Sequence, residues 1–242
     1  MGKFDFLTNL ASIPGFPLFL DYDGTLVPIQ KDPLRCFADK PLIWLLHRLM
    51  EHHEVYIVTG RSMDEIDRML GEKLDAVTWH GNIARVHGRI QYLNSRVEST
   101  IETIDSILLN RERFEESYPG LKVYSKNPGV LFHLWDLSAE MGQKLHRELL
   151  QISQETGTVL YSGKGIYEII PPDSSKGNAI KLLREGREAL IAGDDATDEE
   201  SFRVNSDTFT VKVGQGETAA RHRVSDYMEM RRLLEFILSS RN

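Results

Sequence analysis

Two carboxylates at alternate positions could do chemistry in this chain. Asp21 and Asp23 follow the apolar run of residues 17–20, and Gly24 after them permits a sharp turn. Carboxylates this close repel one another unless a positive group lies among them. Mg²⁺ prefers hard oxygen ligands and usually takes one or two carboxylates together with water and phosphate oxygens. We therefore expect a magnesium ion here, with Asp194 as a further ligand.

Other segments carry groups that could bind an anion. Thr59 and Gly60 end an apolar run just before a helix, so a hydroxyl and backbone N–H groups could face a phosphate. Lys176 opens a later helix, where an ammonium group could neutralise a phosphate oxygen and a carboxylate together. Taken alone, the acidic segments can equally be a turn or a helix cap, Thr59 can be a turn residue, and Lys176 can be a solvated surface lysine. Their shared position in the fold favours the functional interpretation.

That position follows from the order of the predicted elements. Strands at 17–20, 55–58 and 76–79 alternate with helices at 41–50 and 62–70. The alternation resumes after residue 172 with helices at 175–184 and 199–204, strands at 189–192 and 208–213, and two helical stretches to the end. This order predicts an α/β fold with a parallel sheet and crossover helices. Ligands bind such sheets at the carboxyl ends of the strands, and each segment above lies just past such an end or at the start of a helix.

The middle of the chain has a different pattern. A hairpin at 83–93, a helix at 97–114, strands at 121–125 and 130–135, a helix at 138–155 and strands at 158–161 and 165–170 follow in turn. Grouped hairpins and helices indicate an α+β module. We expect a core made of 1–81 and 171–242, with 82–170 inserted as a second domain.

Composition excludes several classes of protein. The 242 residues carry a net charge of −7 and a single cysteine, Cys36. The charge disfavours a nucleic-acid partner, and the lone cysteine excludes a disulfide framework or a zinc knuckle. No apolar run approaches the roughly 18 residues of a membrane span, and no signal peptide is recognised. We expect a soluble, cytoplasmic monomer with a small-molecule ligand and no membrane partner.

The segments at 21–25, 59–61, 174–177 and 193–198 resemble, in order, the motifs of the haloacid dehalogenase (HAD) superfamily of phosphohydrolases. The resemblance implies a Rossmann-like HAD core with an inserted α+β cap. It also implies that Asp21 is a nucleophile that forms an aspartyl-phosphate and that Asp23 is a general acid and base. The other roles that it implies are phosphate binding by Thr59, Gly60 and Lys176, binding of Mg²⁺ by Asp21, the Asp23 carbonyl and Asp194, and support of these groups by Asp195 and Asp198.

Within the superfamily the chain resembles trehalose-6-phosphate phosphatases most. The marks are Tyr22 with the Leu-Val-Pro-Ile continuation at 26–29, Val-Thr-Gly-Arg at 58–61 and Gly-Asp-Asp-Ala-Thr-Asp-Glu at 193–199. The resemblance implies that Lys126, His133 and Glu168 of the cap bind sugar hydroxyls. The chain departs from the family pattern at Trp79, where relatives commonly carry Glu, and at His133-Leu134-Trp135, where they tend to carry His-Tyr-Arg.

The resemblance implies Mg²⁺-dependent hydrolysis of trehalose 6-phosphate to trehalose and phosphate. The departures in the cap leave open a phosphatase of another glycosyl phosphate, such as sucrose 6-phosphate or mannosyl-3-phosphoglycerate. Two other classes are a mutase, which transfers the phosphoryl group to a sugar, and an inactive binding module. Release of free phosphate without an acceptor would exclude the mutase. Loss of an essential residue would indicate the inactive module, whereas Asp21, Asp23, Lys176 and Asp194 are all present.

Overall fold

The chain divides into two compact units. A computed structural model describes residues 4, 7, 10, 13–30, 32–125, 129–163 and 165–239. The first unit comprises Met1–Leu93 and Ser175–Asn242, and the second comprises Asn94–Ser174. No helix in these described ranges combines the length and the apolar character needed to cross a bilayer.

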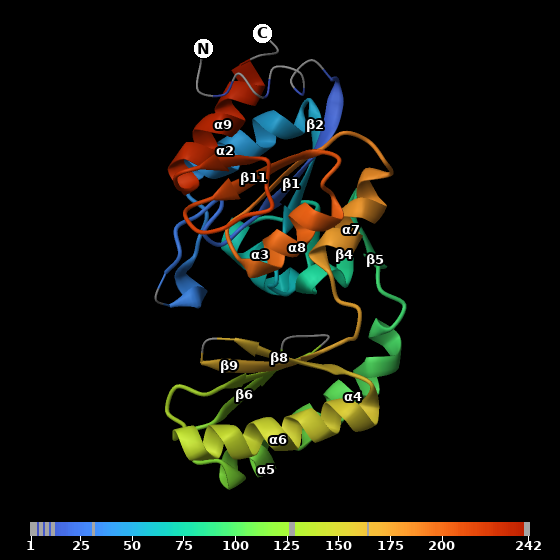
Figure 1. Ribbon diagram of the computed structural model, residues 1–242, viewed down its shortest axis with the longest axis vertical. Helices are drawn as coiled ribbons and strands as arrows, with labels where there is room; N and C mark the ends of the chain where they lie inside the picture. Colours follow the sequence, from blue (N-terminus) through green and yellow to red (C-terminus); the bar gives the residue numbers. More distant parts are fainter. Residues whose placement is uncertain are drawn as a thin grey trace. The chain divides into compact units, whose positions relative to one another are not determined.

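An eight-stranded sheet forms the centre of the first unit (Figure 1). Its strand order is β12-β11-β10-β1-β2-β3-β4-β5, parallel from β12 to β3 and antiparallel from β3 to β5. The strands are β1 (Gly15–Asp21), β2 (His53–Val58), β3 (Ala76–Thr78), β4 (Ile83–Val86), β5 (Arg89–Tyr92), β10 (Leu190–Gly193), β11 (Phe209–Val213) and β12 (His222–Val224). The mixed α/β architecture with a mostly parallel sheet confirms the predicted fold class.

Helices bury both faces of this sheet. On one face, α2 (Lys40–Met50), α3 (Met63–Leu70) and α9 (Tyr227–Ser239) share a core with alternate residues of β1 such as Leu18 and Leu20. On the other face, α7 (Lys176–Arg184) and α8 (Ala196–Val204) pack around Phe19. Burial on both sides explains why β1 is a continuous apolar run rather than an alternating one.

The second unit has one sheet face covered by helices. Its four-stranded antiparallel sheet has the order β6-β7-β9-β8, and the helices pack on one side of it (Figure 1). The elements are α4 (Val97–Leu109), α5 (Arg111–Ser117), β6 (Lys122–Ser125), β7 (Val130–His133), α6 (Ala139–Thr156), β8 (Val159–Gly163) and β9 (Ile166–Ile170). Phe114 of α5, Phe132 of β7 and Leu145 of α6 are buried in the shared core.

Three features differ from the sequence-based expectations. The hairpin β4–β5 extends the sheet of the first unit, because β4 pairs with β3. The boundaries between the units along the chain therefore lie at residues 93/94 and 174/175 instead of 81/82 and 170/171. The helix expected at 97–114 is divided at Asn110, whose φ and ψ of −97° and 13° are not helical. The last part of the chain holds the edge strand β12 and the helix α9, not two helices.

Candidate active site

A buried lysine joins two carboxylates at the carboxyl end of the parallel sheet. Asp21 is the last residue of β1, and Lys176 is the first residue of α7, where Ser175 caps the helix. The Lys176 ammonium group donates to Asp21 Oδ1 at 2.8 Å and to Asp198 Oδ1 at 2.9 Å. All three side chains are buried. Charge-assisted hydrogen bonds therefore replace the water that these groups lose on folding.

Asp194 and Asp198 come from the turn between β10 and α8. Asp195 caps α8 by accepting from the N–H groups of Thr197 and Asp198. The Asp198 carboxylate turns back and accepts from the N–H groups of Asp194 and Asp195, at 3.0 and 3.1 Å. This reciprocal capping fixes the turn. It brings one carboxylate oxygen from each of Asp21, Asp194 and Asp198 within 4.8 Å of one another.

Gly24 makes this approach possible. Its φ is +83°, and a Cβ added at this position would lie 2.1 Å from Asp194 Oδ2. A side chain at residue 24 would therefore occupy the space of the Asp194 carboxylate, besides straining the backbone. The turn after β1 and the turn after β10 are in contact only because residue 24 is glycine.

The electrostatics of the cluster favour an additional cation. Burial raises the pKa of Asp21 well above its ordinary value, and repulsion from Asp198 raises it further. Burial and the same repulsion raise the pKa of Asp194 to about 6. The pKa of Lys176 is raised despite its burial, because Asp21 and Asp198 stabilise its charge. The single ammonium group of Lys176 therefore does not neutralise the negative charge of these carboxylates. Hard oxygen donors at this spacing suit a small divalent cation.

The side chain of Asp23 faces a different cation. Its carboxylate accepts two hydrogen bonds from Arg61, from Nε at 2.6 Å and from Nη2 at 2.7 Å. The expected metal ligand at this residue is its backbone carbonyl. The N–H of the same peptide group, that of Gly24, donates to the Val27 carbonyl at 2.8 Å and so fixes the turn. The structure therefore brings Asp21, Asp194 and Asp198 together but places the Asp23 carboxylate with Arg61.

Thr59 and Gly60 lie directly after β2. Thr59 is buried, and its hydroxyl oxygen accepts from the Arg61 N–H at 3.1 Å. The imidazole of His80 lies against Gly60, where an added Cβ would be 2.5 Å from the ring. His80 and its neighbour Trp79 have φ values of +51° and +59°. Side chains rarely adopt this backbone conformation, and it is more common at functional sites than elsewhere.

Sequence reasoning gave no role to two cations of this region. In the sequence Arg61 is only the last residue of the Thr-Gly-Arg segment, and its partner is 38 positions away. Lys212 lies in the apolar strand β11, where it contacts the backbone carbonyl of Asp194 and, at 3.3 Å, Glu199 Oε1. A single lysine within a run of buried residues was the available signal, because a buried ammonium group needs an anionic or carbonyl partner.

In the second unit, two of the three expected sugar-binding residues are described. Glu168 of β9 is buried and pairs in register with Leu131 and Tyr161, while His133 lies diagonally across on β7. The His133 ring is 4.7 Å from the ring of Trp135, which is 64% exposed. The strand register places Glu168 and His133 on the sheet face opposite the helices. Lys126 lies outside the described residues.

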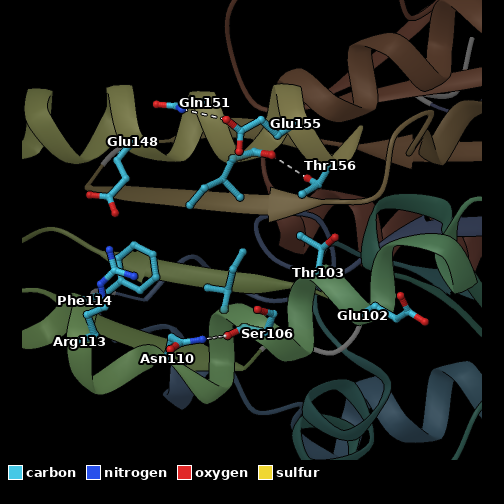
Figure 2. A pocket seen from close by; sticks show the side chains of 12 residues that line it. Glu102, Thr103, Ser106, Asn110, Arg113, Phe114, Glu148, Gln151, Glu155 and Thr156 are labelled. Atoms are coloured by element: carbon cyan, nitrogen blue, oxygen red, sulfur yellow. Dashed lines mark hydrogen bonds between the residues drawn. The ribbon is translucent and has the colours of Figure 1, made fainter.

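A pocket of about 590 Å³ opens between α4, α5 and α6 of the second unit (Figure 2). Glu148 of α6 accepts a hydrogen bond from the Tyr118 hydroxyl at the end of α5, at 2.5 Å, and two other polar side chains bond to groups one helical turn away. Asn110 donates to the Ser106 carbonyl at 2.7 Å, and Gln151 donates to Glu155 at 2.8 Å. None of the residues expected to carry chemistry lines it.

Comparison with known proteins gives consistent matches. Residues 19–229 match the family model described as trehalose-phosphatase. The chain is 43% identical over 220 residues to a trehalose-6-phosphate phosphatase-related protein of Thermoplasma acidophilum, covering 91% of this chain and 96% of that protein. A crystal structure of a trehalose-6-phosphate phosphatase related protein, also 43% identical, aligns with a TM-score of 0.84 over 92% of this chain and 97% of the other. A haloacid dehalogenase-like hydrolase from Bacteroides thetaiotaomicron, 14% identical, shares the fold with a TM-score of 0.67, covering 92% of this chain and 99% of that one.

Proposed function

The chain belongs to the trehalose-phosphatase family, and on that premise we propose that it hydrolyses trehalose 6-phosphate to trehalose and phosphate through an aspartyl-phosphate at Asp21. It is a sugar-phosphate phosphatase with an HAD-like fold. The observation that carries the mechanistic proposal is the buried contact of Lys176 with Asp21, 2.8 Å long, beside the carboxylates of Asp194 and Asp198.

In the first half-reaction, an Asp21 carboxylate oxygen attacks phosphorus and the bond from phosphorus to the sugar oxygen breaks. Asp23 gives a proton to that oxygen, so the sugar leaves as a neutral alcohol. Asp21 is well placed to act as nucleophile because Lys176 fixes one of its oxygens and supports its ionised form against burial.

In the second half-reaction, water attacks phosphorus and Asp23 takes a proton from it. The bond from phosphorus to Asp21 breaks, the Asp21 carboxylate is restored, and inorganic phosphate leaves. One water is consumed for each sugar and phosphate released. Thr59, the N–H of Gly60 and the ammonium group of Lys176 hold the phosphoryl oxygens in both steps.

The carboxylates of Asp21 and Asp194 and the backbone carbonyl of Asp23 would hold Mg²⁺. The raised pKa values of Asp21 and Asp194 support this assignment, because a cation at this position stabilises both ionised carboxylates. When bound, Mg²⁺ screens the repulsion between the nucleophile and the phosphate dianion. Asp198 keeps Lys176 and the turn after β10 in place, and Asp195 caps α8.

The second unit would act as a cap that selects the sugar. His133 and Glu168, on the sheet face that the helices leave uncovered, would bind sugar hydroxyls, together with Lys126. The exposed indole of Trp135, where relatives tend to carry arginine, favours one alternative, namely a phosphatase of another glycosyl phosphate. An apolar ring offers stacking where a guanidinium offers hydrogen bonds, so the preferred sugar would change with it.

A phosphate-release assay over a panel of sugar phosphates tests the substrate. The panel holds trehalose 6-phosphate, sucrose 6-phosphate, mannosyl-3-phosphoglycerate and glucose 6-phosphate, each without an added acceptor. We expect kcat/KM to be highest with trehalose 6-phosphate. Comparable turnover of all the compounds would contradict the assignment, and a requirement for an acceptor sugar would indicate a mutase.

The Asp21→Asn variant tests the nucleophile. Its kcat should fall by several orders of magnitude, as expected for loss of a covalent catalyst. Circular dichroism should be unchanged, because asparagine has the same shape. Retention of more than about 5% of kcat would show that Asp21 does not attack phosphorus.

A further inference from the structure

Arg61 binds the Asp23 carboxylate through two parallel hydrogen bonds. Nε donates to Oδ2 at 2.6 Å and Nη2 donates to Oδ1 at 2.7 Å. The Arg61 side chain is 11% exposed, and that of Asp23 is 32% exposed. A bidentate guanidinium contact fixes both the position and the plane of a carboxylate, which a single ammonium contact does not.

The backbone of Arg61 is itself fixed on both sides. Its N–H donates to the Thr59 hydroxyl at 3.1 Å, and its carbonyl accepts from the Trp79 N–H at 3.0 Å. These contacts connect the guanidinium to β2 and to the segment after β3. Arg61 is therefore a rigid support for Asp23 and not a solvated surface cation.

The Cys36 thiol is near the same Asp23 carboxylate. Burial raises the pKa of the Cys36 thiol, and the nearby Asp23 carboxylate raises it further. The segment that carries Cys36 is held by the buried hydroxyl of Tyr22, which donates to the Cys36 carbonyl at 2.7 Å. Asp23 therefore has neighbours from two separate loops, and Arg61 provides the charged contact.

The two aspartates of the Asp-Tyr-Asp segment thus have separate cations. Lys176 donates to Asp21 and Asp198, whereas Arg61 donates to Asp23. We infer that Arg61 is a positioning residue that holds the Asp23 carboxyl group apart from the Lys176 cluster, at the place where it exchanges a proton with the leaving sugar oxygen. This inference rests on the proposed function, in which Asp23 is the general acid and base.

Positioning of a general acid has a consequence that simple structural support lacks. An alkoxide such as a sugar oxygen is a poor leaving group and needs a proton as the ester bond breaks. The p-nitrophenolate ion is stable without one. Loss of the positioned acid should therefore slow cleavage of an alkyl phosphate far more than cleavage of p-nitrophenyl phosphate.

The experiment compares kcat and KM for trehalose 6-phosphate and p-nitrophenyl phosphate in five proteins. These are the unchanged enzyme, Arg61→Lys, Arg61→Gln, Asp23→Asn and the double variant Arg61→Gln/Asp23→Asn. Burst kinetics with each substrate separate the first half-reaction from the second. The control is Arg187→Gln, which removes a bidentate contact to Glu54 near the start of β2, at the opposite end of this strand from Thr59.

We expect Arg61→Gln and Asp23→Asn each to reduce the burst rate with the sugar phosphate at least about tenfold more than with p-nitrophenyl phosphate. Arg61→Lys should lie between Arg61→Gln and the unchanged enzyme, because lysine keeps the charge but not the paired geometry. The double variant Arg61→Gln/Asp23→Asn should be no slower than Asp23→Asn alone. Arg187→Gln should leave the ratio between the substrates unchanged.

Three results would overturn the inference. Equal loss with both substrates would mean that Arg61 only supports the fold. A rise in KM at unchanged kcat would mean that it binds the phosphate directly, and full activity of Arg61→Lys would mean that charge alone suffices. The proposed function fails in a separate way, if the unchanged enzyme does not cleave the sugar phosphate or if Asp23→Asn shows no difference between the substrates.

Discussion

The ammonium group of Lys176 lies 2.8 Å from Asp21 Oδ1, although the two residues are 155 positions apart. The side chains of Lys176 and Asp21 are only 3% and 7% exposed. The same ammonium group also bonds Asp198, so one positive charge serves two buried carboxylates. The candidate active site is therefore also a point at which the two parts of the chain that form the first unit are held together.

Lys176→Met should destabilise the first unit because it leaves Asp21 and Asp198 buried without their cation. Removing one partner of a buried ion pair typically costs about 3–5 kcal/mol. We expect a loss of this size in the free energy of unfolding measured by urea denaturation. Asp21→Asn/Lys176→Met, which also removes one of the negative charges, should be less affected than Lys176→Met alone. Equal stability of Lys176→Met and the unchanged protein would show that the pair is not formed in solution.

Gly24→Ala should abolish most of the activity, because its Cβ would lie 2.1 Å from Asp194 Oδ2. Displacement of a reacting or ligating group by about 1 Å can cost about a hundredfold in rate. The matched control is Gly71→Ala, at a glycine with a similar φ of +76° and open space where the Cβ would lie. It should lose about 1–2 kcal/mol of stability, because alanine is strained in the left-handed conformation, and keep its kcat/KM. Similar activity losses in both variants would assign the effect to backbone strain alone.

Removal of divalent metal should stop turnover, and Mg²⁺ should restore it. Asp194→Asn should raise the Mg²⁺ concentration for half-maximal activity by at least about tenfold, since it removes a charged ligand. It should also reduce the Mg²⁺-induced increase in Tm, which reports binding without turnover. Asp207→Asn, a change at an exposed aspartate bound to Arg184, serves as the control. Metal-independent turnover would refute the ligand assignment.

The pair of Arg187 and Glu54 should make a small, pH-dependent contribution to stability. Hydrogen bonds from Arg187 lower the pKa of Glu54 below its ordinary value of 4.5. A lowered pKa stabilises the fold fully above pH 4.5, and this contribution is lost as the pH falls through the folded-state pKa. For a partly exposed pair it amounts to about 0.5 kcal/mol.

Thermal unfolding at pH 7 and at pH 3.5 tests this sign. The difference in Tm between the unchanged protein and Arg187→Gln should shrink at the lower pH. A remainder should persist at both values, because Arg187 also donates to the backbone carbonyls of Arg184 and Leu183. Glu54→Gln should show the same pH dependence without that remainder. A difference that grows as the pH falls would contradict the lowered pKa.

Sequence reasoning was accurate where the relevant information is local. The buried run before Asp21, the helix expected from residue 62 to residue 70 and the helix that begins at Lys176 each depend on neighbouring residues. It was wrong where the structure depends on pairing between segments that are distant in the sequence. The hairpin β4–β5 is equally good as part of either unit by pattern, and only its pairing with β3 assigns it to the first.

The sequence alone determined most of the order of strands and helices, apart from the edge strand β12 and the break at Asn110, and the residue types at their ends. It also predicted that acidic and basic groups gather at one sheet edge. Only the tertiary structure decided which groups pair there. Asp21 and Asp23 are two positions apart in the sequence, yet Asp21 accepts a hydrogen bond from Lys176 and Asp23 accepts one from Arg61. The physical reason is that hydrogen-bond partners are selected by distances of about 3 Å between side chains. Such distances depend on how separate loops converge, and periodicity and spacing along the chain do not record that convergence.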